Sequence, residues 1–419
     1  MITKINNLNK LNFFLFFFIF IYFFRSLFLV FSLSDFPWYY EWQHVVYFVE
    51  FKNGDFSSLW SHALRNQFQF FTKLIYLISF KLNGFIWDPK LLTIFIQIIP
   101  SIYISLTLTI LFYKNIQSNL ILVIILIFSF IPSALSNYYH FSESHFYFQI
   151  LFSIISFYIY QNYDGIKLYL LLLLTFILSA INMAAVSIIL YSTFSIFFFI
   201  KYLLFKNNKY LYLFFSLLIF VLFFYYLSFL LQVPSIFETR NVNNIDHLRS
   251  LYLIIKSLLH QNNLLYGLTI LLLLFILIKN SSFSKEYFKN DFVILITIFI
   301  FLLCLSMSLG RSQIYDRYKD FLQIGGLLSL YFLNINILSK IFKNILSLIF
   351  IIVVSYNLLF FLDKVYERRL DTVNYDKSIN ETIKIYKSTG KITSDDISHK
   401  KAKRFVESII LSIENEIIN

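Results

Sequence analysis

The sequence predicts an all-α membrane protein with about eleven transmembrane helices and a small helical tail outside the membrane. Hydrophobic residues make up 58% of the 419 residues and charged residues only 14%, whereas soluble domains carry about 25% charged residues. Apolar runs of about 18 residues or more recur along the chain, and each can span a bilayer as a helix. The runs are continuous rather than alternating, which argues against a β-barrel.

The positive charge of the chain fits the same architecture. The formal net charge is +12, and the excess of lysine and arginine falls in short loops between apolar runs, as the positive-inside rule requires of cytoplasmic loops. We therefore exclude nucleic acid as a partner and expect membrane lipids instead. The single cysteine, Cys304, allows no internal disulfide.

The first predicted span covers residues 11–31, and Lys4 and Lys10 before it place the N-terminus in the cytoplasm. Arg25 falls late in this span, so it should snorkel or face the protein interior. The loop that follows is then external. Residues 66–87 are apolar but contain Lys73 and Lys81; if they crossed, the lysine clusters of all later loops would face outward. The number of crossings decides the side of every later loop, so residues 66–87 are predicted to be an external amphipathic or re-entrant segment. They belong to an external loop region of residues 34–90.

Further spans are expected in the rest of a transmembrane domain that covers residues 1–362. The run of residues 166–201 is too long for one span, so it should form a hairpin broken near residues 180–185. Residues 232–263 form a second long external loop. The other spans are predicted at residues 91–113, 120–135, 146–160, 210–231, 264–278, 292–309, 321–336 and 345–362.

The tail, residues 363–419, is the one soluble stretch, and parity places it outside the cytoplasmic (inner) membrane. Its sequence SDDI at residues 394–397, followed by residues 400–413, predicts a capped helix. The helix carries an apolar stripe at Ala402, Phe405, Val406, Ile409 and Ile413. The tail is too small for a catalytic domain and should pack as a cap on the outer loops.

Three polar islands lie on the external side of this topology. The first, residues 34–65, contains Asp35 and Glu41 among several tryptophans and histidines. The second, residues 137–149, contains His140, Glu143, His145 and Gln149. The third, residues 310–320, contains Arg311, Asp316, Arg317 and Tyr318. Guanidinium groups bind phosphate oxygens in pairs, and a nearby carboxylate can accept a proton from an attacking hydroxyl. Together the islands predict a cavity for a phosphate-bearing ligand.

Each island also has a simpler interpretation. The tryptophans and tyrosines of the first could form an interfacial belt, Arg311 and Arg317 could anchor lipid headgroups, and Glu143 could cap a helix or pair with a histidine. His140 and His145 are five residues apart and do not share a helix face as a metal-binding pair would. We therefore predict no cofactor and no metal ligands, with a divalent metal left open.

Short motifs in the islands resemble those of a known enzyme class. They are LWSHALR at residues 59–65, ESHFYFQ at residues 143–149 and DRY at residues 316–318. Together with the order of spans and outer loops, they resemble the GT-C class of membrane glycosyltransferases, and most closely a group of bacterial GT-C-like membrane proteins. The Asn-Glu pair that this group carries in the first motif is replaced here by Ala63 and Leu64, and Asp316 stands where it has serine.

The resemblance implies a GT-C-like fold and an inverting transfer of a sugar from a polyprenyl-phosphate donor to a surface glycan or lipid acceptor. It implies a catalytic acid in the first outer loop, near the end of the first span, where Asp35 lies. Glu41 and Glu143 are the supporting acids. The substrate-binding residues would be His62, Arg65, His140, Gln149, Arg311, Arg317 and Tyr318.

Two alternatives remain beside the transferase. An O-antigen or capsule polymerase would share its substrates and topology. A lipid-linked sugar flippase or transporter should show inverted repeats and helices broken by glycine and proline near mid-membrane. This chain has 8 Gly and 5 Pro, and its polar groups gather at one face, which favours an enzyme.

Overall fold

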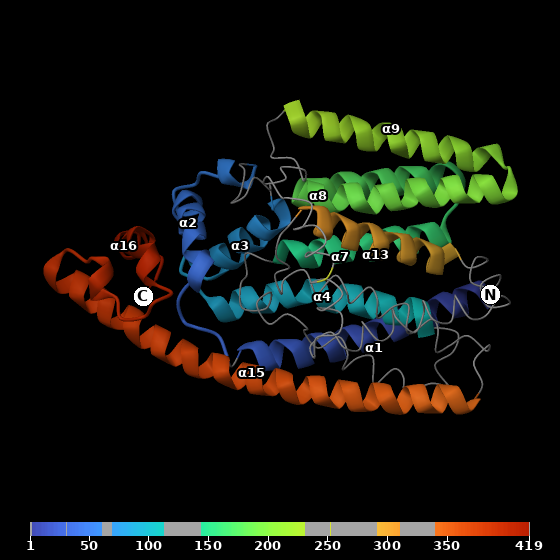
Figure 1. Cartoon of the computed structure of the whole chain (residues 1–419). Coiled ribbons are helices and arrows are strands. Elements are labelled where there is room, and N and C mark those ends of the chain that lie inside the picture. Colours follow the sequence, from blue (N-terminus) through green and yellow to red (C-terminus); the bar gives the residue numbers. More distant parts are fainter. Residues whose placement is uncertain are drawn as a thin grey trace.

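The computed structural model describes residues 2–30, 32–60, 69–112, 144–230, 252, 291–310 and 340–418, and this part contains helices and turns but no strand. Long helices lie roughly side by side as a bundle (Figure 1). They are α1 (Ile2–Val30), α4 (Pro89–Phe112), α7 (His145–Asn162), α8 (Gly165–Phe205), α9 (Asn208–Leu230), α13 (Asp291–Gly310) and α15 (Lys340–Thr389).

Short helices form a separate layer at the end of the bundle where α1 ends (Figure 1). We call it the end layer. It consists of η1 (Tyr39–His44), α2 (Val45–Lys52), η2 (Ser57–Leu59), α3 (Phe70–Leu82), η6 (Ser394–Asp396), η7 (Lys403–Phe405) and α16 (Val406–Glu414). The N-terminus lies at the opposite end of the bundle from the C-terminus (Figure 1).

The chain is a helical membrane protein by the length and composition of its helices. Within the described residues, four segments are long and apolar enough to cross a bilayer: Lys10–Leu27, Pro89–Ile110, Gly165–Asn182 and Ser187–Phe205. The spans predicted at residues 146–160, 292–309 and 345–362 fall within α7, α13 and α15. The span predicted at residues 210–231 coincides with α9 as far as Leu230, and residue 231 lies outside the described residues. Those predicted at residues 120–135, 264–278 and 321–336 lie outside the described residues, so the total of about eleven remains a prediction.

Helix α1 packs on α4 through one stripe of side chains. Phe17, Ile21 and Leu29 are buried on it, at the four-residue spacing that keeps side chains on one helix face. Arg25 lies on the same stripe, is only 6% exposed, and donates a hydrogen bond from Nε to Oε1 of Gln97 at 3.1 Å. Arg25 therefore faces the protein interior, one of the two positions predicted for it. The opposite face of α1 exposes Phe16, Ile19 and Phe23, as a lipid-facing surface would.

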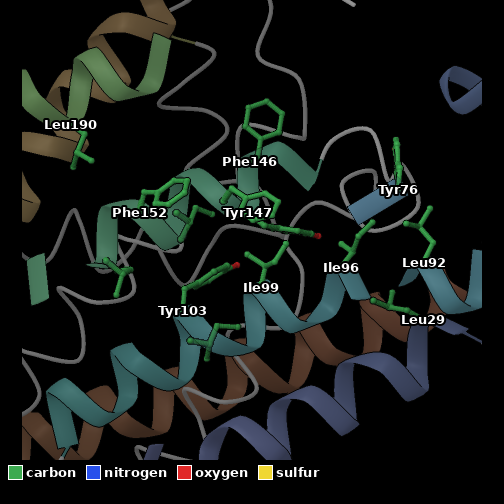
Figure 2. Packing of buried hydrophobic residues seen from close by; sticks show 14 of the residues in the cluster. Leu29, Tyr76, Leu92, Ile96, Ile99, Tyr103, Phe146, Tyr147, Phe152 and Leu190 are labelled. Carbon is green, nitrogen blue, oxygen red and sulfur yellow. The ribbon is translucent and has the colours of Figure 1, made fainter. Parts of the chain in front are cut away.

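The core continues from α4 to α7, where aromatic and aliphatic side chains interdigitate (Figure 2). Ile96, Ile99 and Tyr103 of α4 point toward Tyr147 of α7 in this view, and all four are buried. Apolar burial of this kind contributes about 25 cal/mol per Å².

Helix α8 is a hairpin. Its helical pattern runs over 41 residues, yet the chain reverses direction within it. Oγ of Ser179 lies 2.6 Å from Oγ of Ser187, whereas eight residues of straight helix would separate them by about 12 Å. Tyr191 also donates a hydrogen bond to the carbonyl oxygen of Leu172. The two arms lie side by side in Figure 1, and the predicted hairpin is confirmed, with its reversal between Ser179 and Ser187.

The described part of residues 66–87, which begins at Gln69, finishes in the end layer. Nζ of Lys52, before it, donates to the carbonyl of Asn415 at 2.6 Å, and the backbone N–H of Trp87, at its end, donates to the carbonyl of Ile417 at 2.7 Å. Helix α3 within it has 13 residues and rises about 20 Å, less than the roughly 30 Å of a bilayer core. The short length of α3 and the contacts at residues 52 and 87 favour a segment that does not cross, which stays a prediction. The predicted packing of the tail on the first loop is confirmed.

The tail begins as a continuation of the last predicted span. No break occurs at residue 362: α15 continues over 50 residues, about 75 Å, because no glycine or proline interrupts it. It ends before Gly390, whose φ of 67° is the left-handed conformation that commonly closes helices. The predicted helix at residues 400–413 is also shorter, since η7 precedes it and α16 begins at Val406.

Candidate functional site

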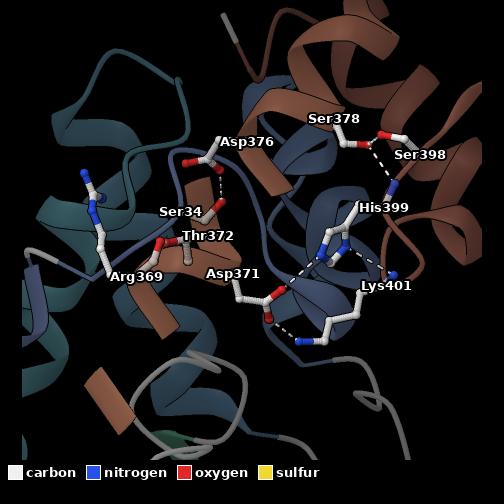
Figure 3. A network of polar contacts seen from close by, with 9 residues as sticks. All are labelled: Ser34, Arg369, Asp371, Thr372, Asp376, Ser378, Ser398, His399 and Lys401. Carbon is white, nitrogen blue, oxygen red and sulfur yellow. Dashed lines mark hydrogen bonds and ion pairs between the residues drawn. The ribbon is translucent and has the colours of Figure 1, made fainter. Parts of the chain in front are cut away.

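The end of α1 and the C-terminal helix α15 bring two carboxylates together. Oγ of Ser34 donates a hydrogen bond to Oδ1 of Asp376 at 2.5 Å, as Figure 3 shows. The backbone N–H of Asp35 donates to Oδ2 of Asp376 at 3.3 Å. These residues are 341 positions apart in the chain. Asp35, the predicted base, thus lies where α15 passes into the end layer.

Lys90 and Arg369 lie near this carboxylate pair. Nζ of Lys90, at the start of α4, lies 3.8 Å from Oδ1 of Asp35, and both side chains are more than half exposed. Burial raises the pKa of Asp376, and the charge of Asp35 adds to this effect, while the hydrogen bonds from Ser34 and Asp35 and the charge of Arg369 act against it. The pair therefore consists of the exposed carboxylate of Asp35 and the partly buried carboxylate of Asp376, which holds its proton more tightly than an ordinary aspartate does.

Glu41 has a capping position. Its Oε2 accepts a hydrogen bond from the backbone N–H of Trp38 at 2.8 Å, which forms half of a capping box at the start of η1. The side chain is buried. The structure gives Glu41 a role in holding the loop, and its assignment as a supporting catalytic acid stays a prediction.

An aromatic cluster ties the same loop to α15. The hydroxyl of Tyr375 donates to the carbonyl of Pro37 at 2.8 Å and accepts from Nε1 of Trp42 at 2.5 Å. The ring of Trp38 lies 4.4 Å from that of Tyr375. Trp38 and Trp42 are buried, so these two tryptophans serve packing within the protein rather than the interfacial belt considered above.

A second polar network fixes the tail to α15. Asp371 contacts Nε2 of His399 at 3.1 Å and Nζ of Lys401 at 2.5 Å, as Figure 3 shows. Burial alone would raise the pKa of Asp371, but the hydrogen bonds and charges of Lys401 and His399 hold it below its usual value. The guanidinium of Arg368 stacks 3.3 Å above the ring of Trp38. This network holds residues 399–401 against α15 and the first loop.

Gln149, predicted to bind substrate, lies buried between α7 and the tip of the α8 hairpin. Its Nε2 donates to the carbonyl of Ser179 at 2.9 Å, and its Oε1 accepts from Oγ of the same serine at 2.7 Å. Asn182 donates to the carbonyl of His145 at 2.8 Å. Gln149 thus links two helices, and contact with a substrate remains a prediction for it.

The other predicted site residues cannot be placed beside this pair. Seven of them lie outside the described residues: His62, Arg65, His140, Glu143, Arg311, Arg317 and Tyr318. The meeting of the three islands in one cavity therefore remains a prediction. Among the described residues, no group of three or more His, Cys, Asp and Glu side chains could hold a metal ion.

Sequence reasoning missed Asp376 and Tyr375. Neither belongs to a motif, and their partners are more than 330 residues away. A weak signal was present: Thr372, Tyr375 and Ile379 repeat at helical spacing and are all buried, which is typical of a helix face packed on a partner.

Comparison with known proteins adds no relative. No protein-family model matches the chain, and neither a curated protein nor a solved structure does. The function is therefore inferred from the residues of the chain itself.

Proposed function

We propose that the protein is a membrane glycosyltransferase that moves a sugar from a polyprenyl-phosphate donor to a surface glycan or glycolipid acceptor, at the outer face of the cytoplasmic membrane. One observation supports this most. Asp35 is exposed at the end of the membrane helix α1, with the cation of Lys90 at 3.8 Å from its carboxylate. A donor whose lipid lies in the membrane presents its phosphate and sugar at such a boundary.

Each residue of this arrangement has a chemical role in the proposed reaction. The carboxylate of Asp35 accepts the proton of the acceptor hydroxyl while that oxygen forms a bond to the anomeric carbon of the sugar. The bond between the anomeric carbon and the phosphate oxygen breaks, and the lipid phosphate leaves with the electron pair. Positive charge stabilises the leaving phosphate, and Lys90 offers such a charge next to Asp35. Arg311 and Arg317 are the further phosphate ligands that the sequence predicts.

The test removes the base and keeps its shape. Asp35→Asn should lower product formation about 10²–10⁴-fold, because an amide cannot accept the proton. The measurement is glycolipid product, by mass spectrometry, in a strain that lacks the native gene and carries each variant. Asp395→Asn, an exposed acid in the tail, is the matched control and should leave the product unchanged.

The form of the product separates the candidate functions. Addition of a single sugar supports the transferase, while a ladder of lengthened glycans supports the O-antigen or capsule polymerase. Unchanged product from Asp35→Asn, at normal abundance in the membrane, would remove Asp35 from the reaction. Movement of an intact lipid-linked sugar without a new glycosidic bond would support the flippase or transporter instead.

A further inference from the structure

We propose that Asp376, on the C-terminal helix α15, is the positioning residue for Asp35. This inference rests on the proposed function. Its carboxylate accepts hydrogen bonds from two successive residues, Oγ of Ser34 at 2.5 Å and the backbone N–H of Asp35 at 3.3 Å. The tail of the protein would then be part of the catalytic machinery rather than only a cap.

The hydrogen bonds extend over the whole turn that carries Asp35. Oγ of Ser34 also accepts from the backbone N–H of Phe36 at 3.1 Å, so the hydroxyl relays this contact to Asp376. The next carbonyl, that of Pro37, is held by the hydroxyl of Tyr375. Two adjacent residues of α15 therefore fix the backbone of the turn, while the side chain of Asp35 remains exposed. A base whose backbone is fixed in this way has less conformational freedom to lose before it acts.

The neighbouring charge gives this arrangement an electrostatic consequence. The groups facing Asp376 are Asp35 from the turn and Arg369 from α15 itself, and Lys90 from α4 faces Asp35. Burial raises the pKa of Asp376, and the hydrogen bonds from Ser34 and Asp35 oppose this. A protonated carboxyl group accepts hydrogen bonds more weakly than the charged carboxylate does, so the turn is held less firmly once Asp376 has taken up its proton. Loss of that charge should therefore be visible in the pH dependence of the reaction.

Substitutions at residue 376 separate position from charge. Asp376→Ala removes both acceptors and should lower kcat about 10–10²-fold with little change in KM, because the base is displaced but the substrate site is untouched. Asp376→Asn keeps one acceptor and loses the charge. It should retain more activity than Asp376→Ala and move the acid limb of the pH–rate profile to lower pH. Ser34→Ala should resemble Asp376→Ala without the change in the pH profile.

The experiment uses full-length protein in nanodiscs and a panel of undecaprenyl-phosphate-linked hexoses and pentoses, with release of undecaprenyl phosphate as the readout. Asp371→Asn is the control on the same helix, since Asp371 binds His399 and Lys401 instead of the turn. It should leave kcat and the pH profile unchanged. Hydrogen exchange at residues 32–37 should increase in Asp376→Ala and not in Asp371→Asn.

The outcomes distinguish the inference from the proposed function. No release with the wild-type protein would overturn both. Release that Asp35→Asn abolishes, together with a wild-type rate and pH profile in Asp376→Ala, would overturn the inference alone. Equal losses in Asp371→Asn and Asp376→Ala, with equal exposure of the tail to exchange, would also overturn it, because Asp376 would then only help to hold the tail.

Discussion

Lys73 is a buried cation in the end layer. Its side chain is fully buried, its Nζ donates to the carbonyl of Ser58 at 2.6 Å, and it lies 4.9 Å from the ring centre of Tyr47. Burial lowers the pKa of Lys73 to about 8, and the charge of Glu50 only partly opposes this. The folded protein therefore binds this proton less tightly than the unfolded chain does.

This shift predicts a pH dependence of stability. Between pH about 8 and the ordinary lysine pKa of 10.5, the unfolded chain binds more protons, so the free energy of unfolding should rise with pH. The rise from this one group is at most about 1.4 kcal/mol per pH unit. Lys73→Met should lack it, and Lys81→Met, on the exposed side of α3, should keep it. Chemical unfolding in detergent measures the slopes, and equal slopes in wild type and Lys73→Met would contradict the prediction.

Tyr375 carries a second prediction at this scale. Tyr375→Phe removes the hydroxyl that joins Pro37 and Trp42, so a buried acceptor and a buried donor lose a partner. Each such loss costs about 1–3 kcal/mol, and we expect the free energy of unfolding to fall by about 2–4 kcal/mol. Tyr386→Phe is the control, because its hydroxyl bonds the exposed Glu414 and should matter little. Limited proteolysis of the tail compares the two variants, and equal cleavage would refute the assignment.

The helices show why some elements could be predicted from the sequence and others could not. The α8 hairpin follows from local information, because an apolar run longer than a bilayer must turn back. The continuity of α15 was missed because its change from apolar to polar residues at Leu362 resembles the end of a span. The backbone responds to a different signal, which is the first helix-breaking residue, Gly390.

The hairpin can be tested by cross-linking. With Cys304→Ala as background, Ser179→Cys and Ser187→Cys should form a disulfide on mild oxidation, because the two Oγ atoms lie 2.6 Å apart. Disulfides need Cα atoms within about 7 Å, which a straight helix does not offer to this pair. Ser179→Cys with Ser195→Cys is the control and should not cross-link. Peptide mapping after proteolysis reads the result, and an unlinked first pair would show that α8 is straight.

For the whole molecule, the sequence predicted that the tail packs on the outer loops and missed which residues make the contacts. Asp35 was found because its place, just after the first apolar run, is a local feature. Asp376 was not found because its meeting with Asp35 depends on how segments at opposite ends of the chain fold against each other. The same physical reason applies to the end layer, where α16 packs on α2. Each helix buries a few apolar side chains, such as Phe48 of α2 and Ile409 of α16, and only the fold selects the pairing.

These contacts, combined with charge, predict the orientation of the molecule in the membrane. Lys52 and Trp87 both bond the tail, so we expect the first loop, the end of residues 66–87 and the tail to share one side of the membrane. Lys167 and Lys206 lie at the two ends of α8, away from its hairpin tip, and cytoplasmic lysines are the rule.

In a Cys304→Ala background, Asp55→Cys, Asp88→Cys and Asp395→Cys should react with an impermeant maleimide in intact cells. Lys167→Cys and Lys206→Cys should react only after permeabilisation. Labelling of Asp88→Cys and Asp395→Cys from opposite sides of the membrane would contradict the fold. If every cysteine instead showed the reverse of its expected accessibility, the fold would stand but the carboxylate pair would lie on the cytoplasmic side, where the proposed outer-face transfer could not take place.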